Sequence, residues 1–110
     1  MRRFLLIAAM VAASILPGNA AYYSGNEIMT KCDDELAFNK GFCLGYFAAV
    51  ADSWSNSRLV GGPPECLSAA VTVGQIRDVV VKFLRDNPAR RHEDTNGLEV
   101  RALYLAFCPQ

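Results

Sequence analysis

VTVGQIRDVVVKFLRDNP, residues 71–88, is the stretch that decides the fold. Thr72 and Gln75 have the spacing of a capping box, in which each side chain bonds the other residue's backbone N–H at a helix start. Val71 and Ile76 occupy the positions of a hydrophobic staple. Apolar residues then recur on one side at helical spacing. Pro88 ends the pattern, because the residue before a proline is kept out of the helical conformation. We therefore predict an amphipathic helix that begins after Thr72 and ends before Pro88.

Three further helices are predicted, over about residues 25–38, 40–55 and 96–107. Ser24 and Glu27 form a second capping box, and Asn96 and Glu99 have the same spacing. Apolar residues recur at helical spacing in each segment: Ile28, Met29, Cys32 and Leu36; Cys43, Tyr46, Phe47, Val50 and Trp54; Leu98, Ala102 and Leu105. No segment alternates in the manner of a strand. The sequence predicts an all-α fold, a small four-helix bundle-like domain.

Two features of the 40–55 segment need interpretation. Gly41 and Gly45 are spaced so that another backbone can approach the helix closely. The dimerisation role of this spacing belongs to membrane helices, so we favour close packing within the chain. Asp52 lies on an otherwise apolar helix, and two interpretations stay open: an exposed carboxylate, or a buried one that accepts bonds from a loop.

The first 20 residues, MRRFLLIAAMVAASILPGNA, have the pattern of a signal peptide. A basic start at Arg2 and Arg3 precedes 13 apolar residues, and small residues stand before a cleavage point after Ala20. A membrane helix needs about 20 apolar residues, so an anchor is disfavoured. We expect residues 1–20 to be a signal peptide, residues 21–110 to be the mature domain, and the mature protein to be exported without membrane attachment.

Four cysteines, Cys32, Cys43, Cys66 and Cys108, lie in the expected mature part. An even count in a small exported chain indicates two disulfides. The spacings of 11, 23 and 42 positions contain no close ligand pair of the kind that zinc sites use. Cys32 and Cys43 flank the turn between the first two helices. Cys66 precedes the third helix and Cys108 follows the fourth, so antiparallel packing of these helices would bring both to one end. We predict the pairs Cys32–Cys43 and Cys66–Cys108.

The chain offers little material for catalysis. His92 is its single imidazole, it stands in a polar segment, and disulfides would consume the cysteine nucleophiles. The run Asp33-Asp34-Glu35 is better explained as a solvated face than as an acid–base pair. With 11 basic and 11 acidic residues the chain also lacks the charge of a nucleic-acid binder. We expect no catalytic residue, no metal, no cofactor and no nucleic acid.

Two long segments outside the predicted helices are candidates for contact with a partner protein, because binding residues concentrate on loops held by a rigid scaffold. They cover residues 57–65 and 87–95. In the second segment the candidate partner-binding residues are Arg90, Arg91, His92 and Asp94.

Several stretches resemble a known family. They are Cys43-Leu44-Gly45-Tyr46 continuing through Asp52, residues 71–84 followed by Asn87-Pro88 and His92, and residues 98–107 followed by Cys108-Pro109. Together they are similar to the Rap/Tai type of immunity proteins, the partners of type VI secretion amidase effectors. The resemblance covers about residues 27–109. Ser68-Ala69, and the place of Pro109 after Cys108, depart from the family pattern.

The resemblance implies a small helical protein, exported to the periplasm and often dimeric. Such a protein binds a peptidoglycan-cleaving amidase and blocks its active-site cleft, with no catalysis of its own. The competing hypothesis is a periplasmic acid-stress chaperone, which exposes apolar surface when its carboxylates become protonated. An orphan binding protein of the same fold, or a hydrolase that depends on His92, are further alternatives.

Overall fold

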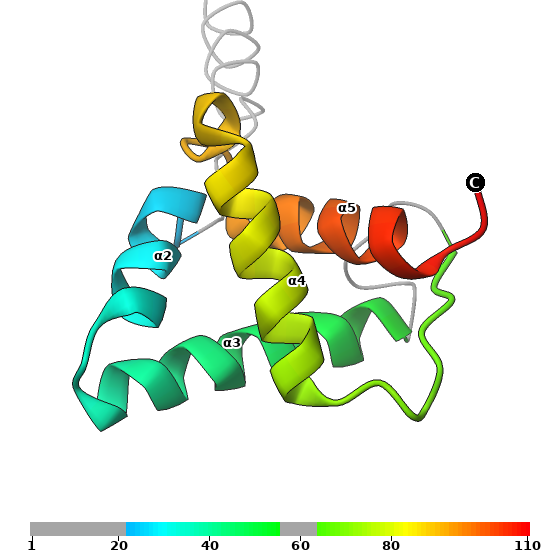
Figure 1. The fold of residues 1–110 in the computed structure, drawn as a ribbon, viewed down its shortest axis with the longest axis horizontal. Coiled ribbons are helices and arrows are strands. Elements are labelled where there is room, and N and C mark those ends of the chain that lie inside the picture. Colours follow the sequence, from blue (N-terminus) through cyan, green and yellow to red (C-terminus); the bar gives the residue numbers. More distant parts are fainter. Residues whose placement is uncertain (1–21, 56–63) are drawn as a thin grey trace, which may run out of the picture.

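The computed structural model describes residues 22–55 and 64–110, most of which are helical. Figure 1 shows the helices in their order along the chain. Their bounds are α2 Gly25–Asp33, α3 Ala37–Ser55, α4 Val73–Asp86, the short 3-10 helix η1 Pro88–Arg90, and α5 Thr95–Phe107. Within the described residues the only β-type pairing is an isolated bridge between Ser24 and Asp94. The all-α prediction is confirmed, whereas the signal-peptide prediction lies outside the described residues.

Two helix starts are built as the sequence predicts. At α4, Gln75 N donates to Thr72 Oγ1 at 3.1 Å, and Thr72 N donates to Gln75 Oε1 at 2.7 Å. At α2, Ser24 and Glu27 make the same reciprocal pair, with both distances 3.2 Å. These bonds satisfy backbone N–H groups that have no partner inside a helix. Capping chemistry therefore fixes where both helices begin.

The first helix is shorter than predicted, because Asp34 breaks it. Asp34 leaves the helical conformation at φ −73° and ψ 141°. Its carboxylate accepts from Leu36 N at 3.0 Å and from Asn39 Nδ2 at 2.7 Å. A short polar side chain that bonds the following backbone in this way competes with helix formation. α3 therefore begins at Ala37, and Leu36 lies in the turn instead of on the buried face of α2.

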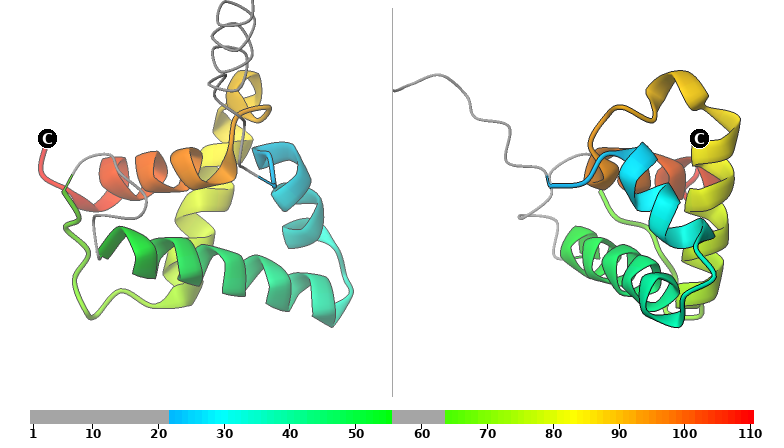
Figure 2. Two further views of the ribbon diagram at one scale, coloured as in Figure 1. Left: turned by 180° about the vertical axis from the view of Figure 1, so that it is seen from behind. Right: turned by 90° about the vertical axis from the view of Figure 1, so that its left-hand side faces the viewer.

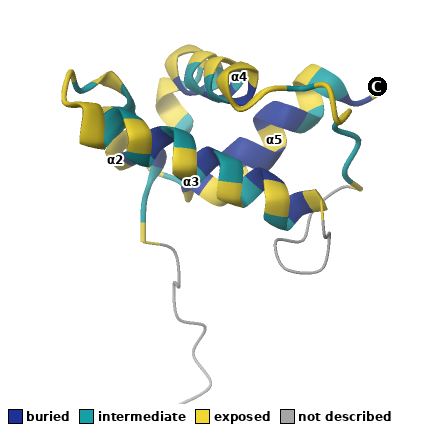
Figure 3. Ribbon diagram, turned by 90° about the horizontal axis from the view of Figure 1, so that it is seen from below, coloured by how far each residue is buried: buried dark blue, intermediate teal, exposed yellow. Residues whose placement is uncertain are grey.

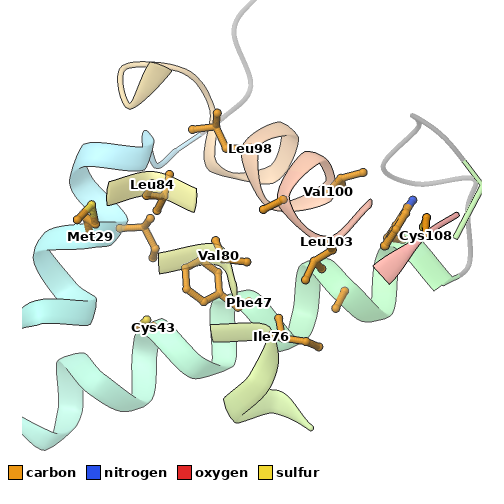
Figure 4. Close-up of a cluster of buried hydrophobic side chains, with 14 residues drawn as sticks. Met29, Cys43, Phe47, Ile76, Val80, Leu84, Leu98, Val100, Leu103 and Cys108 are labelled. Atoms are coloured by element: carbon orange, nitrogen blue, oxygen red, sulfur yellow. The ribbon is translucent and has the colours of Figure 1, made fainter. Parts of the chain in front are cut away.

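The helices cross one another around one core and do not lie parallel. Figures 1 and 2 show α4 crossing both α3 and α5, with α2 packed beside them. The buried residues of α3 and α5 form the inner surfaces coloured dark blue in Figure 3. Figure 4 shows the cluster that they enclose together with α2 and α4. Its largest fully buried apolar side chains are Trp54, Phe47, Ile28, Leu84, Leu98 and Leu103.

Both predicted disulfides are present. Cys32–Cys43 joins α2 to α3 with a Cα–Cα distance of 5.1 Å, and Cys66–Cys108 has a distance of 5.6 Å. The second pairing arises differently from our expectation of antiparallel helices. Residues 64–72, which precede α4 in the chain, pass beside the carboxyl end of α5 before they reach the start of α4, as Figure 1 shows. This extended segment places Cys66 next to Cys108.

Three expectations about helix faces are now decided. A Cβ atom added at Gly41 or Gly45 meets no atom of the described residues within 4 Å, so close packing against them is wrong as the explanation of this pair. Asp52 is exposed, so its carboxylate is not buried in the core. Leu105 is 44% exposed, because α5 turns this side away from the core.

The start of α5 also differs from the expected capping pattern. The helix begins at Thr95, and Asp94 at its N-cap makes no side-chain capping bond. Glu99, placed by its spacing as a partner in capping, is wholly buried instead. It lies one turn after Thr95 on the inward side of the helix, where tertiary packing overrides the local pattern.

Candidate partner-binding surface

Residues 88–94 form a folded loop braced by its own side chains. Arg90 makes two bonds to the Glu93 carboxylate, from Nε at 2.9 Å and from Nη2 at 3.0 Å. Its guanidinium also lies over the Phe83 ring, 5.9 Å from the ring centroid. The Arg90 hydrogen bonds hold the pKa of Glu93 below its usual value. Arg90 thus braces the loop while its side chain remains about 40% exposed.

Arg91 points into the domain. Its Nη1 donates to the sulfur of Met29 at 3.5 Å, and its backbone oxygen accepts from Asn26 N at 2.8 Å. Its Nε is buried and has no hydrogen-bond partner among the described residues. Arg91 therefore joins the loop to α2, so of the predicted quartet it offers the least to an external protein.

His92 and Asp94 are the exposed members of the quartet. They flank the backbone of Glu93, whose oxygen accepts from Gly25 N at 3.0 Å. Thr95 N in turn donates to Tyr23 O at 3.0 Å. We call this pairing of residues 23–26 with residues 91–95 the terminal clasp. It holds the loop rigidly, with His92 and Asp94 facing solvent.

Gly25 is required where the terminal clasp meets the core. A Cβ atom there would lie 2.9 Å from Leu98 Cδ1 and 3.1 Å from the backbone oxygen of Arg91. We expect Gly25→Ala to lower the free energy of unfolding by about 2 kcal/mol through overpacking. Gly41→Ala is the matched control, since its Cβ would meet open space, and it should raise stability by about 0.5–1 kcal/mol. Urea unfolding measures both, and equal effects would contradict the assigned role of Gly25.

A second exposed feature was missed in the sequence. Leu36 and Phe38, in and just after the turn between α2 and α3, are 64% and 79% exposed. Leu36 was predicted on the core face of the first helix, and the break at Asp34 places it in the turn instead. The Asp34-x-Leu36 geometry is a local signal that could have shown this, because an Asp side chain often bonds the backbone N–H two residues later in a turn.

A charged groove of about 500 Å³ runs beside this turn, between it and α4. Arg85 Nη2 donates to Asp33 Oδ1 across it at 2.6 Å. Acidic and basic side chains line it in equal number: Asp33, Glu35, Asp78, Asp86, Lys40, Arg77, Lys82 and Arg85. The balance of charge gives it no preference for an anion or a cation.

Glu99 and Thr95 are the two polar residues buried in the described core. Both are 0% exposed, and neither the Glu99 carboxyl oxygens nor Thr95 Oγ1 has a hydrogen-bond partner in the described part of the chain. Burial raises the pKa of Glu99 to about 9, so the carboxyl group is neutral at pH 7. A group shielded from solvent in this way cannot meet an external substrate.

The arrangement of the described residues supports the binding of a partner better than catalysis. Among residues 22–55 and 64–110, no three His, Cys, Asp or Glu side chains are grouped so that they could hold a metal ion. No helix in these ranges is both long and apolar enough to cross a membrane. The exposed residues of the loop and the turn include His92 and Asp94 at the loop and Leu36 and Phe38 at the turn. The other predicted loop, residues 57–65, lies mostly outside the described residues.

Comparison with protein-family models matches residues 24–108 to the family described as Rap1a immunity proteins. The matched range begins at the capping residue of α2 and ends at the last disulfide cysteine. The comparisons with curated proteins and with solved structures found no match.

Proposed function

The chain belongs to the Rap1a immunity protein family, and from this premise we propose that it binds and blocks a peptidoglycan amidase delivered by type VI secretion. The match over residues 24–108 is the observation that carries the proposal, since it spans every described helix. Membership makes the chain an immunity protein against a secreted effector. The amidase as target, and the periplasm as the place of action, follow from the resemblance of the sequence to the Rap/Tai type.

The structure supports inhibition by binding without catalysis. Two disulfides and the terminal clasp hold the exposed loop and turn in fixed positions, so little conformational entropy is lost when a partner binds. Disulfides also persist in oxidising compartments, which supports action outside the cytoplasm. At the loop, we propose that His92 and Asp94 contact the partner while Arg90 and Arg91 hold the loop in shape. Association into a homodimer is a further part of the proposal.

The acid-stress chaperone is less well supported. That hypothesis requires acid to loosen the domain, yet Glu99, the carboxyl group buried in the core, is already neutral at pH 7. Acidification therefore leaves the charge of this core group unchanged. A chaperone would protect unrelated client proteins from aggregation near pH 3, and we expect no such protection.

The proposal is tested by capture followed by inhibition. The tagged, oxidised protein is used to capture partners at neutral pH from a periplasmic extract of its own bacterium, grown with secretion active. We expect one cell-wall amidase at near-stoichiometric amounts. The purified amidase should then lose its activity on peptidoglycan when the protein is added at one-to-one ratio. Mass spectrometry of the tagged protein should show a chain that begins at Ala21.

Other outcomes would contradict the proposal. If many weak partners or none are retained, the proposed immunity role against an amidase is wrong, and the orphan or chaperone alternative is favoured. If an amidase is captured but keeps its full activity, the protein binds without blocking. Light scattering of the purified protein reports whether it is a dimer.

A further inference from the structure

The turn between α2 and α3 presents two large apolar side chains to solvent. Leu36 is 64% exposed and Phe38 is 79% exposed, and they are two positions apart. Single exposed apolar residues are ordinary on protein surfaces, whereas neighbouring ones suggest an interaction site. We call Leu36 and Phe38 the apolar tip. The exposed Leu105 on α5 belongs to a different helix.

The backbone beneath the apolar tip is fixed before any partner arrives. The Cys32–Cys43 disulfide closes the turn on one side. The Asp34 carboxylate bonds Leu36 N and Asn39 Nδ2 on the other, and these bonds hold the pKa of Asp34 below its usual value. An aromatic side chain on a rigid backbone loses little entropy on binding, and such residues often dominate the energy of an interface.

The charges next to the apolar tip indicate its partner. Three acidic residues, Asp33, Asp34 and Glu35, precede it directly, and one basic residue, Lys40, follows it and acts electrostatically on the Asp34 carboxylate. Asp33 is paired with Arg85, and Asp34 is committed to the turn, whereas Glu35 is exposed and forms no ion pair with a described residue. A complementary surface has an apolar pocket with a basic residue at its rim. Two tips related by a two-fold axis would instead bring like charges together, which disfavours a second copy of this chain.

We propose that the apolar tip inserts into an apolar pocket with a basic rim on the effector protein, Phe38 filling the pocket and Glu35 facing the basic residue. The proposal rests on the proposed function and adds to the 88–94 loop a second contact, built from the α2–α3 turn. The two contacts lie at opposite ends of α2.

Site-specific photo-crosslinking in the producing bacterium tests the tip. Benzoylphenylalanine replaces Phe38 in one full-length chain, Leu105 in a control chain and His92 in a third. With secretion active, we expect position 38 to crosslink to one effector and position 105 to crosslink to none. Crosslinks from position 92 alone, from no position, or from position 38 to this chain itself would overturn the proposal.

The identity of the crosslinked protein separates this inference from the proposed function. A single amidase at position 38 supports both. A different secreted effector at position 38 supports the tip and contradicts the amidase as target.

An affinity comparison gives a second readout. With the crosslinked effector purified, Phe38→Ala should weaken binding by about 30-fold or more, as loss of an aromatic anchor does. Glu35→Lys should weaken binding more at low salt than at high salt, because it reverses the charge that faces the basic rim of the pocket. Leu105→Ala should bind as the parent does. Unchanged thermal unfolding of Phe38→Ala shows that it is folded, and unchanged affinity in that variant would refute the tip.

Discussion

Replacing Cys66 and Cys108 together by Ala is expected to lower the free energy of unfolding by about 4 kcal/mol, from the chain-entropy value for a closed loop of 42 residues. The loop that this bond closes contains α4, η1 and α5. It also fixes residues 64–72, which contain no helix, lead into the start of α4 and are tied to the end of α5 through Cys108. Removal of the bond therefore frees both a long loop and an extended segment in the unfolded state.

The other disulfide supplies the matched control. Cys32 and Cys43 close a loop of only 11 residues, so their joint replacement by Ala should cost about 3 kcal/mol. Urea unfolding followed by circular dichroism measures both variants against the oxidised parent. A larger loss from the shorter loop would contradict the ranking, and would place the main effect in the α2–α3 turn.

The second large expected effect is the dependence of the free energy of unfolding on pH, which arises from Glu99. Its pKa of about 9 in the folded protein lies far above the value of 4.5 for an ordinary glutamate. The stabilisation that the folded protein has while the Glu99 carboxyl group is protonated is therefore fully present below about pH 4.5. This stabilisation is lost as the pH rises towards 9. The free energy of unfolding should fall by about 1.4 kcal/mol per pH unit in that window.

Glu99→Gln should remove this dependence. Glutamine has nearly the same shape and stays neutral in both states, so the variant should be more stable than the parent by about 3 kcal/mol at pH 7 and about equal to it at pH 4. Glu35→Gln, at an exposed position, is the control and should keep the parent's profile. Denaturant unfolding across the pH range gives the curves. Parallel curves for the parent and Glu99→Gln would mean that the folded state does not raise this pKa.

Local chemistry is what made much of the fold predictable. The pair Thr72 and Gln75 defines a helix start through bonds between residues three apart, and the structure contains those bonds. Pro88 stops the same helix through a steric effect on its neighbour. The Cys32–Cys43 pair followed from the order of helices and cysteines along the chain, whereas Cys66 and Cys108 meet through the extended segment 64–72.

Other features depended on contacts that a single chain does not display. Glu99 lies at capping distance from Asn96, but its environment is set by helices that pack over it. Arginine is usually a surface residue, and Arg91 turns inward only because α2 docks against its loop. Of the candidate site, the loop was located from its polar composition, whereas the apolar tip depended on the early end of α2 at Asp33.

The terminal clasp has a consequence for how the protein is made. Ser24 pairs with Asp94, a partner 70 positions further along the chain. In the proposed export, the amino-terminal end crosses the membrane first and must wait for residues 91–95 before it can dock. Contacts of such long sequence separation form late and slow folding. The chain would therefore stay unfolded during most of its translocation, as passage through a narrow channel requires, and would close only when nearly all of it has crossed.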